Sequence, residues 1–329
     1  MKILFIGDPH LKVSRLEDSK KLLTWIESIA RQEKVDMAVN LGDAFHNHAV
    51  LRSEIMCEFN DHIHRMTKIC RYIYLLGNHD MWKPDCSKYN AIKIFNHENF
   101  TAITKTTNIC DITFVPYIHN YKEFPLETNK ICVAHQTFVG ADYGYYRPDV
   151  GADADKISAD IIISGHIHKR QSFGKVIYPG SPMSDGIVDI DQEKGVMIFD
   201  TKTYEYRFIT SPFPMWRSMA FDLSETTINN MNDLIKNNIT EKDHWVIKIA
   251  GPKAEIVSYL SSKQWKELNS SYSIKVKPEY KDNKKVFKTQ IKSLSVKDVL
   301  DEYIKNIYDG SLEVESIRDK VSELFANTD

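Results

Sequence analysis

Short apolar runs alternate with amphipathic segments through the first half of the chain. Buried-strand patterns recur there, at Lys2 to Gly7, Met37 to Leu41, Ile69 to Leu76, Ile112 to Val115, Ile131 to Ala134 and Ile161 to Ser164. Between the first three of these strands, apolar residues at helical spacing predict two helices, from Leu22 to Ile29 and from Leu51 to Met66. Strands that alternate with helices are typical of a layered α/β domain.

The pattern becomes richer in strands after Ile177. Two segments, Gly195 to Asp200 and Tyr204 to Ile209, have the apolar content of strands, and we expect them to complete a second sheet. The run from Ser211 to Pro214 contains two prolines and is typical of a boundary. We therefore expect a catalytic domain at residues 1–214, a smaller α/β unit at residues 215–292 and a C-terminal helical segment at residues 293–329.

The C-terminal segment has a strong helical signature. Ser295 and Asp298 resemble a capping box, and a wide apolar stripe follows at Val296, Val299, Leu300, Tyr303, Ile304, Ile307 and Tyr308. A stripe of this width must be buried. It packs either against its own domain or against a partner protein.

Charge is distributed unevenly, although the formal net charge is only -2 and excludes a uniformly basic protein. The region from Lys263 to Lys292 has nine lysines against three acidic residues, with aromatic residues between them. Such a patch is able to contact DNA phosphates, and our candidate contacts are Lys275, Lys277, Lys284 and Lys285. A solvated lysine face over a small core is the alternative.

Cysteine usage and apolar runs indicate the compartment. The five cysteines form no CxxC pair, and an odd count favours reduced thiols. No apolar run approaches the length of a membrane span, so we expect a cytoplasmic protein without membrane contact. The chain has no GxxxxGK[ST] motif, and any ATP hydrolysis coupled to its function must come from another polypeptide.

Polar side chains able to bind metals follow strand after strand. They are Asp8, His10, Asp43, His46, Asn78, His79, Asp80, His135, His166 and His168. Singly these signals are weak, because Asp-x-His occurs by chance and a lone histidine is more often structural. Together they predict one shared site, since ligands of open α/β sheets bind beyond the carboxyl ends of the strands.

The residue types suit a pair of divalent cations. Two cations about 3.5–4 Å apart need a shared anionic ligand, for which Asp43 is the candidate. Asp8 and His10 are expected on one face of an extended strand because of its two-residue period, and His166 and His168 share this spacing. With two carboxylates against two dications, the pocket keeps a charge of about +2, which favours a phosphate ester.

These residues, in the order D-x-H, G-D, G-N-H-D, H and G-H-x-H, resemble the calcineurin-like metallophosphoesterases over residues 1–200. The resemblance implies a two-layered β-sandwich flanked by helices. It implies that one ion binds Asp8, His10, Asp43 and His168, and that the other binds Asp43, Asn78, His135 and His166. His79 would stabilise the transition state or protonate the leaving oxygen, with Asp80 orienting it.

Two further segments, GDAFH at Gly42 to His46 and YPGSP at Tyr178 to Pro182, resemble the SbcD-type double-strand-break repair nucleases. Chain length, the Phe199-Asp200-Thr201 segment and the C-terminal amphipathic helix look most like phage members of this type. The resemblance implies a DNA exo- and endonuclease, with Mn²⁺ as the expected ion and Mg²⁺, Fe²⁺ or Zn²⁺ as alternatives. His46 would be a second active-site histidine, unless it only serves the entry to a helix.

The same resemblance implies partners. It implies a homodimer within a heterotetramer, in which the coiled coil of an SbcC-type ABC ATPase binds Val299, Leu300, Tyr303, Ile304 and Ile307. It also implies the cytoplasm of a phage-infected host as the location.

Two other functions remain open at this point. One is a phosphatase or cyclic-nucleotide phosphodiesterase that uses the same ions on a small substrate. The other is a DNA-bridging subunit without catalysis. His48 lies close to the GDAFH loop but matches no ligand position, and the histidines outside the motifs are expected to be structural or exposed.

Overall fold

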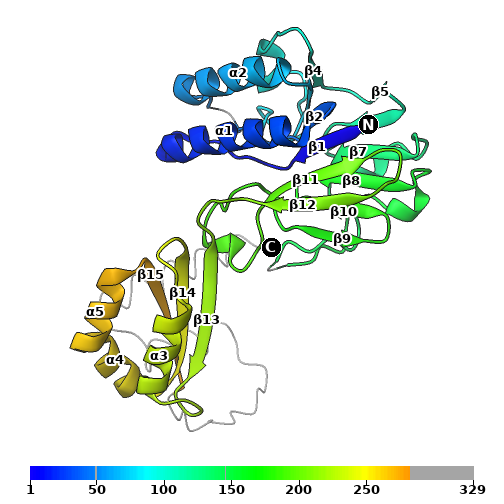
Figure 1. Cartoon of the computed structure of the whole chain (residues 1–329). Coiled ribbons are helices and arrows are strands. Elements are labelled where there is room, and N and C mark those ends of the chain that lie inside the picture. The colour runs from blue at the N-terminus through cyan, green and yellow to red at the C-terminus, as the bar shows by residue number, and fades with distance from the viewer. Residues whose placement is uncertain (49, 145, 282–329) are drawn as a thin grey trace, which may run out of the picture. The chain divides into compact units, whose positions relative to one another are not determined.

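Two six-stranded sheets form the larger part of the structure (Figure 1), a computed structural model that describes residues 1–281 apart from Ala49 and Tyr145. In spatial order, the first sheet consists of β12 (Tyr206–Thr210), β11 (Gly195–Asp200), β1 (Lys2–Ile6), β2 (Met37–Asn40), β3 (Arg71–Leu75) and β4 (Phe100–Ile103). The second consists of β5 (Thr107–Ile109), β6 (Ile112–Val115), β7 (Ile131–His135), β8 (Ile161–Gly165), β10 (Val176–Tyr178) and β9 (Gln171–Phe173).

Alternation along β1 sends its side chains into two different cores. Ile3 and Phe5 pack in the layer between the two sheets, whereas Leu4 and Ile6 pack under the helices on the outer face. Because both faces are buried, the strand is a continuous apolar run rather than an alternating one. The expected β-sandwich flanked by helices is confirmed.

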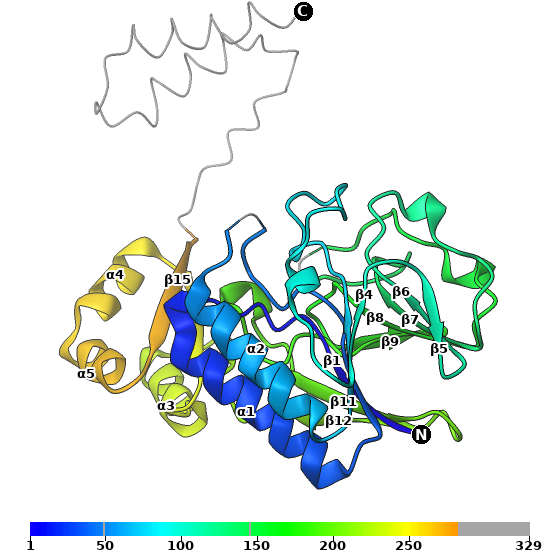
Figure 2. The same cartoon turned by 90° about the horizontal axis from the view of Figure 1, so that it is seen from above.

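Two helices that run in the same direction cover the outer face of the first sheet. Helices α1 (Leu16–Glu33) and α2 (Ser53–Thr67) lie side by side there (Figures 1 and 2). A buried polar cluster joins them, in which Glu27 accepts hydrogen bonds from His62 Nδ1 at 2.7 Å and from Arg65 Nε at 3.0 Å. The cluster fixes the C-terminal half of α2 against α1.

The strands after residue 190 belong to the first sheet, and our expectation that they complete the second sheet is wrong. β11 pairs antiparallel with β1, and β12 pairs antiparallel with β11. The edge strands of the second sheet are instead the short strands β5 and β9, at Thr107–Ile109 and Gln171–Phe173. Apolar content predicts a strand, but the choice of pairing partner depends on contacts that are distant in sequence.

A third, parallel sheet follows Pro214, with the order β13 (Trp216–Asp222), β14 (His244–Gly251) and β15 (Ile274–Tyr280). Its core is shared with helices α3 (Ile228–Asn238), α4 (Lys253–Ser261) and α5 (Lys263–Ser271). Lys275 and Lys277 are exposed on β15, and the Lys275 ammonium lies 4.7 Å from the centre of the Trp216 ring. The boundaries at residues 214 and 292 stay predictions.

Several expected features lie outside the described residues. They are Lys284, Lys285 and the C-terminal segment with its apolar stripe. Within the described part of the chain, no helix is both long enough and apolar enough to cross a bilayer.

The Glu27 cluster gives a test of the helix pair. Burial alone would raise the pKa of Glu27, but the hydrogen bonds from His62 and Arg65 outweigh it and lower this pKa. The pKa of Glu27 is therefore lower in the folded protein than in the unfolded chain, where it is about 4.3. Above that pH, the carboxylate stabilises the folded protein. This stabilisation is lost as the pH falls through the pKa of the folded state. We expect Glu27→Gln to reduce the free energy of unfolding by about 1.5–3 kcal/mol at pH 7.

Urea denaturation at pH 7 and at pH 3 measures this effect. The difference between Glu27→Gln and the wild type should shrink at the lower pH, because the wild-type carboxylate is then losing its charge. An equal difference at both pH values would contradict an ionic role for Glu27.

Candidate metal centre

The first metal-capable residues lie in turns rather than in strands. β1 ends at Ile6 and β8 ends at Gly165, so Asp8, His10 and His166 come after their strands. His10 and His166 have φ values of 43° and 81°, in the left-handed region. Our expectation that an extended strand places Asp8 and His10 on one face is therefore wrong. The conformation of the turn orients the side chains of Asp8 and His10. A hydrogen bond from His10 N to the Asp43 carbonyl, at 3.0 Å, holds this turn in place.

Two glycines allow the turns after β2 and β3 to approach each other. Gly42 has a φ of 114°, and a Cβ there would collide with the His135 ring and with the backbone of Gly77. A Cβ on Gly77 would collide with the Asp43 carboxylate. The glycines of the Gly-Asp and Gly-Asn-His-Asp motifs are thus explained by close backbone contact.

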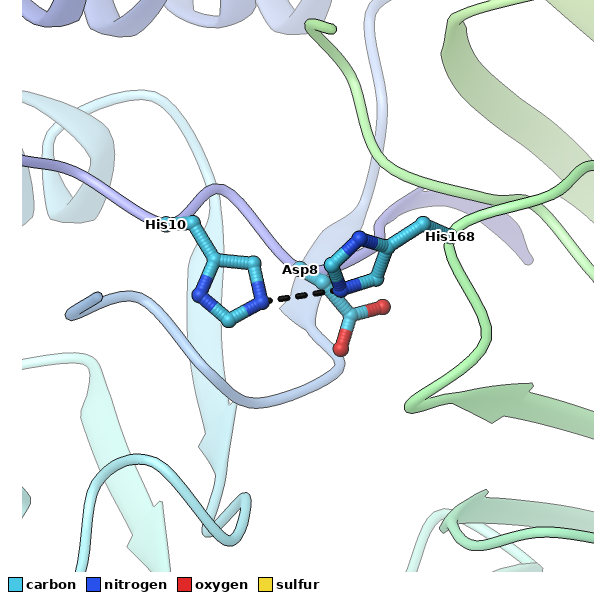
Figure 3. Close-up of side chains that lie close together, drawn as sticks. All are labelled: Asp8, His10 and His168. Atoms are coloured by element: carbon cyan, nitrogen blue, oxygen red, sulfur yellow. Dashed lines mark hydrogen bonds between the residues drawn. The ribbon is translucent and has the colours of Figure 1, made fainter. Parts of the chain in front are cut away.

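One group of possible ligands forms around the first turn. Atoms of Asp8, His10 and His168 able to bind a cation lie within 4.8 Å of one another. Figure 3 shows the two imidazoles facing each other, with 2.9 Å between the Nε2 atoms of His10 and His168. Two ring nitrogens at this distance need either a shared proton or a shared cation between their lone pairs.

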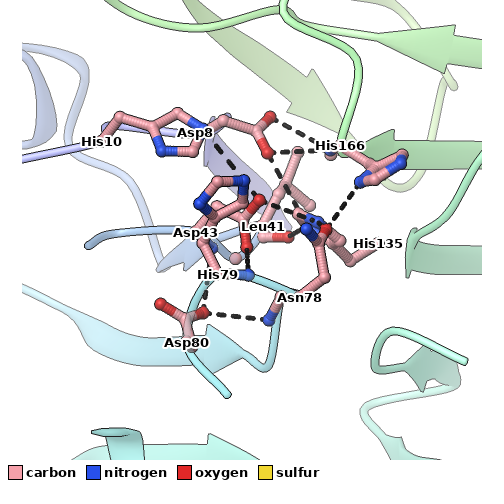
Figure 4. A network of polar contacts seen from close by, with 12 residues as sticks. Asp8, His10, Leu41, Asp43, Asn78, His79, Asp80, His135 and His166 are labelled. Atoms are coloured by element: carbon pink, nitrogen blue, oxygen red, sulfur yellow. Dashed lines mark hydrogen bonds and ion pairs between the residues drawn. The ribbon is translucent and has the colours of Figure 1, made fainter. Parts of the chain in front are cut away.

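A second group lies beside it, formed by Asp43, His135 and His166. Its imidazoles converge on the side-chain oxygen of Asn78, which lies 3.1 Å from His135 Nε2 and 2.7 Å from His166 Nδ1 (Figure 4). His135 Nδ1 donates to the Leu41 carbonyl at 2.7 Å, which leaves Nε2 as the atom that faces the group. Orientation of a ligand ring by a backbone carbonyl is usual in metal sites.

Asp43 lies between the two groups. Its Oδ2 is 3.4 Å from His135 Nε2 and 4.0 Å from His10 Nε2. Its Oδ1 accepts a hydrogen bond from the backbone N–H of His79 at 2.7 Å. Among the polar residues of the described chain, Asp43 therefore has the position that a carboxylate shared by two cations requires.

The electrostatics of the site favour positive charge. Burial would lower the pKa of His135, but the carboxylates of Asp43 and Asp8 outweigh it and raise this pKa to about 9. Burial would raise the pKa of Asp43, but His135, His10 and His79 lower it well below its usual range. Burial and the charge of His135 lower the pKa of His166 to about 3.

His79, which we expected to bind no ion, lies with His10 and Asp43 in a third group whose possible ligand atoms are within 4.8 Å of one another. Its Nδ1 donates to the His46 carbonyl at 2.9 Å, and its ring stacks on His48 with 3.9 Å between the centroids. His48 itself bonds through Nδ1 to the Asn78 carbonyl at 3.0 Å. The His46 side chain is 37% exposed and lies 3.9 Å from the Asp185 carboxylate.

Asp80 has other partners than the one we expected. We expected it to orient His79, but its carboxylate accepts hydrogen bonds from the Tyr74 hydroxyl at 2.6 Å and from the backbone N–H groups of Asp43 and Gly77, both at 2.9 Å. Burial, together with the charge of Asp43, raises the pKa of Asp80 to about 7. Asp80 therefore joins the turns after β2 and β3, and the His46 carbonyl orients the His79 ring.

Three residues of the two groups, Asp43, His166 and His168, open into a cavity of about 250 Å³. It is lined by Asp43, Asn78, His79, Tyr143, His166, His168, Asp185, Val188 and Asp189. We did not predict Asp185 and Asp189 from the sequence. They lie after the YPGSP run and before β11. In the sequence, an acidic residue in such a segment looks the same as an ordinary surface residue.

A buried lysine supports this wall of the cavity. Lys194 is fully buried, and its ammonium bonds to Asp189 Oδ1 at 3.0 Å, to the His168 carbonyl at 3.0 Å and to Ser181 Oγ at 2.9 Å. Burial lowers its pKa, and Asp189 partly opposes this. Lys194 thereby holds the backbone of His168 in place.

The donor set fits divalent cations. The two groups offer imidazole nitrogens, two carboxylates and one amide oxygen, all buried or half-buried and convergent. His10 Nδ1 has no hydrogen-bond partner among the described residues, so the position of its ring depends on the atoms facing Nε2. Such mixed nitrogen and oxygen sets bind Mn²⁺, Fe²⁺ or Zn²⁺.

Comparisons with known proteins agree with this geometry. The family model described as "Calcineurin-like phosphoesterase" matches residues 1–170, and the chain belongs to this family. It is similar to "Putative phosphoesterase 078R" of Invertebrate iridescent virus 3, with 24% identity over 95% of this chain and 94% of that protein. It is 33% identical to "Putative phosphoesterase 244L" of Invertebrate iridescent virus 6, over 68% of this chain and 86% of that protein. The protein is thus a metal-binding hydrolase that acts on phosphoesters.

Lys194 gives a test of the support beneath the site. Lys194→Met would leave the buried Asp189 carboxylate without its ammonium partner, and we expect a loss of about 3–5 kcal/mol in the free energy of unfolding. The double variant Asp189→Asn/Lys194→Met should recover part of this loss, because the uncompensated charge is gone. Chemical denaturation measures both variants.

The matched control is Lys130→Met, since this lysine is 78% exposed and pairs with the surface residue Asp160. It should change stability by no more than about 0.5 kcal/mol. A Lys194→Met protein as stable as the control would show that the buried ion pair does not support the fold.

Proposed function

We propose that this phosphoesterase is a DNA nuclease of the SbcD type, which cleaves phosphodiester bonds as an exonuclease and endonuclease in recombination and double-strand-break repair. Mn²⁺ is the proposed ion. Within this type, the sequence looks most like the small subunit of the recombination endonuclease of T-even-like phages.

One observation carries the proposal. The GDAFH sequence brings a further imidazole, His46, next to the pocket, with its ring centroid 5.7 Å from that of His10 and 6.4 Å from that of His79. His46 lies in none of the possible ligand groups of the described chain and is partly exposed. A hydrogen-bonding side chain in this position suits a diester, whose strand continues beyond the phosphate that is cleaved.

The bound cations would supply a nucleophilic water with a lowered pKa and would neutralise charge on the phosphate. Asp8, His10, Asp43 and His168 would hold one cation, and Asp43, Asn78, His135 and His166 the other. Asp43 would orient both cations, because its two oxygens are fixed by His79 N–H and by the histidines on either side.

His79 is suited to move a proton. A carbonyl oxygen only accepts hydrogen bonds, so the Nδ1 of His79 must donate to His46 O and retains its proton. Nε2 is then the atom that exchanges a proton with the substrate, and a protonated ring would donate to the leaving oxygen from this atom. The stacked His48 ring restricts the rotation of His79.

Binding of DNA along the rest of the chain is supported by exposed lysines. Lys275 and Lys277 are exposed on β15 and are proposed to contact phosphates, together with Lys284 and Lys285, which lie outside the described residues. The ABC ATPase partner, the homodimer and the docking residues of the C-terminal stripe stay proposals that follow from the resemblance. So does the cytoplasmic location.

Cleavage of end-labelled duplex DNA tests the function. The purified chain with Mn²⁺ should degrade linear duplex, and EDTA should abolish the activity. We expect His79→Asn to lower turnover by about 10²–10⁴-fold, the usual contribution of a general acid, while Mn²⁺ binding by calorimetry is retained.

The matched control is His119→Asn, since His119 is an exposed histidine outside the motifs. It should cleave DNA at the wild-type rate. Hydrolysis of bis(p-nitrophenyl) phosphate without cleavage of any DNA would replace the proposed function by a small-substrate phosphodiesterase. Binding of DNA and of the ATPase without any hydrolysis would replace it by a bridging role.

A further inference from the structure

A short hairpin directly after His79 and Asp80 exposes two aromatic rings. Trp82 is 49% exposed and Tyr89 is 57% exposed, and their ring centroids lie 6.3 Å apart. Scattered single aromatic residues are normal on protein surfaces, but two adjacent rings that remain in water indicate a ligand.

The hairpin is built to hold these rings in place. Its base is closed by the β-bridge between Met81 and Asn90 and by the hydrogen bond from Trp82 N to the Tyr89 carbonyl at 3.0 Å. Met81 is buried in the core, and Ala91 N donates to the Asp80 carbonyl at 2.8 Å. The rings are therefore presented on an anchored turn.

A lysine ammonium lies over each of the two rings. The Lys83 ammonium lies 4.4 Å from the centre of the Trp82 ring, and the Lys88 ammonium lies 5.2 Å from the centre of the Tyr89 ring. Neither lysine forms an ion pair with any residue of the described chain, and both are exposed. The surface thus combines flat apolar faces with positive charges that have no fixed anion.

We propose that Trp82 and Tyr89 form a stacking platform for unpaired bases of single-stranded DNA, with Lys83 and Lys88 contacting the adjacent phosphates. This inference rests on the proposed nuclease function and adds a preference for unpaired nucleotides at the site. Alternation of aromatic rings and lysines is the chemistry by which proteins bind single strands without reading sequence.

Stacking of a base on either ring requires the base to replace the lysine that lies over that ring, and the free energies favour this replacement. A base stacked on an aromatic ring gains more free energy than an exposed ammonium does over the same ring. A base is therefore able to displace the lysine from the ring face. The released ammonium is then free to contact a phosphate of the same strand.

The platform lies close to the catalytic residues. Only Asp80 and Met81 lie between His79 and Trp82 in the sequence, so the Cα atoms of His79 and Trp82 are at most about 11 Å apart. A base stacked on Trp82 would belong to a nucleotide near the phosphate that is cleaved. Fully paired ends would have to open before they engage the platform.

Fluorescence anisotropy of labelled oligo-dT, measured with the full chain in EDTA so that no cleavage occurs, tests the platform. We expect Trp82→Ala/Tyr89→Ala to bind oligo-dT about 10- to 100-fold more weakly than the wild type, and Trp82→Phe/Tyr89→Phe to retain most of the affinity. Affinity for a closed duplex without free ends should change by less than about twofold, because its bases are not available for stacking.

Ile94→Ala is the matched control, since Ile94 is 57% exposed and follows the same hairpin without an aromatic ring. It should bind oligo-dT as the wild type does. A double alanine variant that binds oligo-dT within twofold of the wild type would overturn the platform, and DNA cleavage by the wild type would show that the nuclease function survives. A wild type that neither binds nor cleaves DNA would overturn both.

A second measurement does not depend on the folding of the double variant. Oligo-dT should quench the tryptophan fluorescence of the wild type, because Trp82 is half exposed and would stack on a base. The quenching should be much weaker in Trp82→Phe. Equal quenching in both proteins would contradict stacking on Trp82.

Discussion

The geometry of the site depends on the buried carboxylate of Asp80. It accepts the backbone N–H groups of Asp43 and Gly77 and the hydroxyl of Tyr74, and so joins the turns that follow two neighbouring parallel strands. Through this junction the Asp43 side chain reaches the space between two clusters of histidines. Without it, two glycine-containing turns would be free to separate, and the carboxylate shared by both clusters would lose its position.

Electrostatic balance connects this junction with the function. Buried carboxylates are costly unless positive charge compensates them, and here the histidines provide part of the compensation. The negative charge of Asp43 and Asp8, which raises the pKa of His135, also attracts cations. Bound cations in turn attract the phosphate of the substrate. Residues outside the clusters serve this arrangement indirectly: Lys194 fixes the backbone of His168, and the His46 carbonyl fixes the ring of His79.

Much of the arrangement could be predicted from the sequence, because strand patterns and the residues that follow them are local signals. The strands ending before Asp8, Asp43, Asn78 and His166 were predicted within a few residues, and the structure brings these side chains together. Three features could not be predicted. The pairing of β11 with β1 depends on contacts distant in sequence, the left-handed turns at His10 and His166 depend on bonds from neighbouring loops, and the burial of Lys194 depends on a turn that contributes Asp189.

Asp43 lies between two groups of possible cation ligands. Anomalous scattering from crystals soaked in Mn²⁺ would show whether a cation binds on each side of its carboxylate. We expect two separate peaks, one beside Asp8, His10 and His168 and the other beside Asn78, His135 and His166, with the Asp43 carboxylate between them. No peak in this pocket, or peaks bound elsewhere on the protein, would contradict the account.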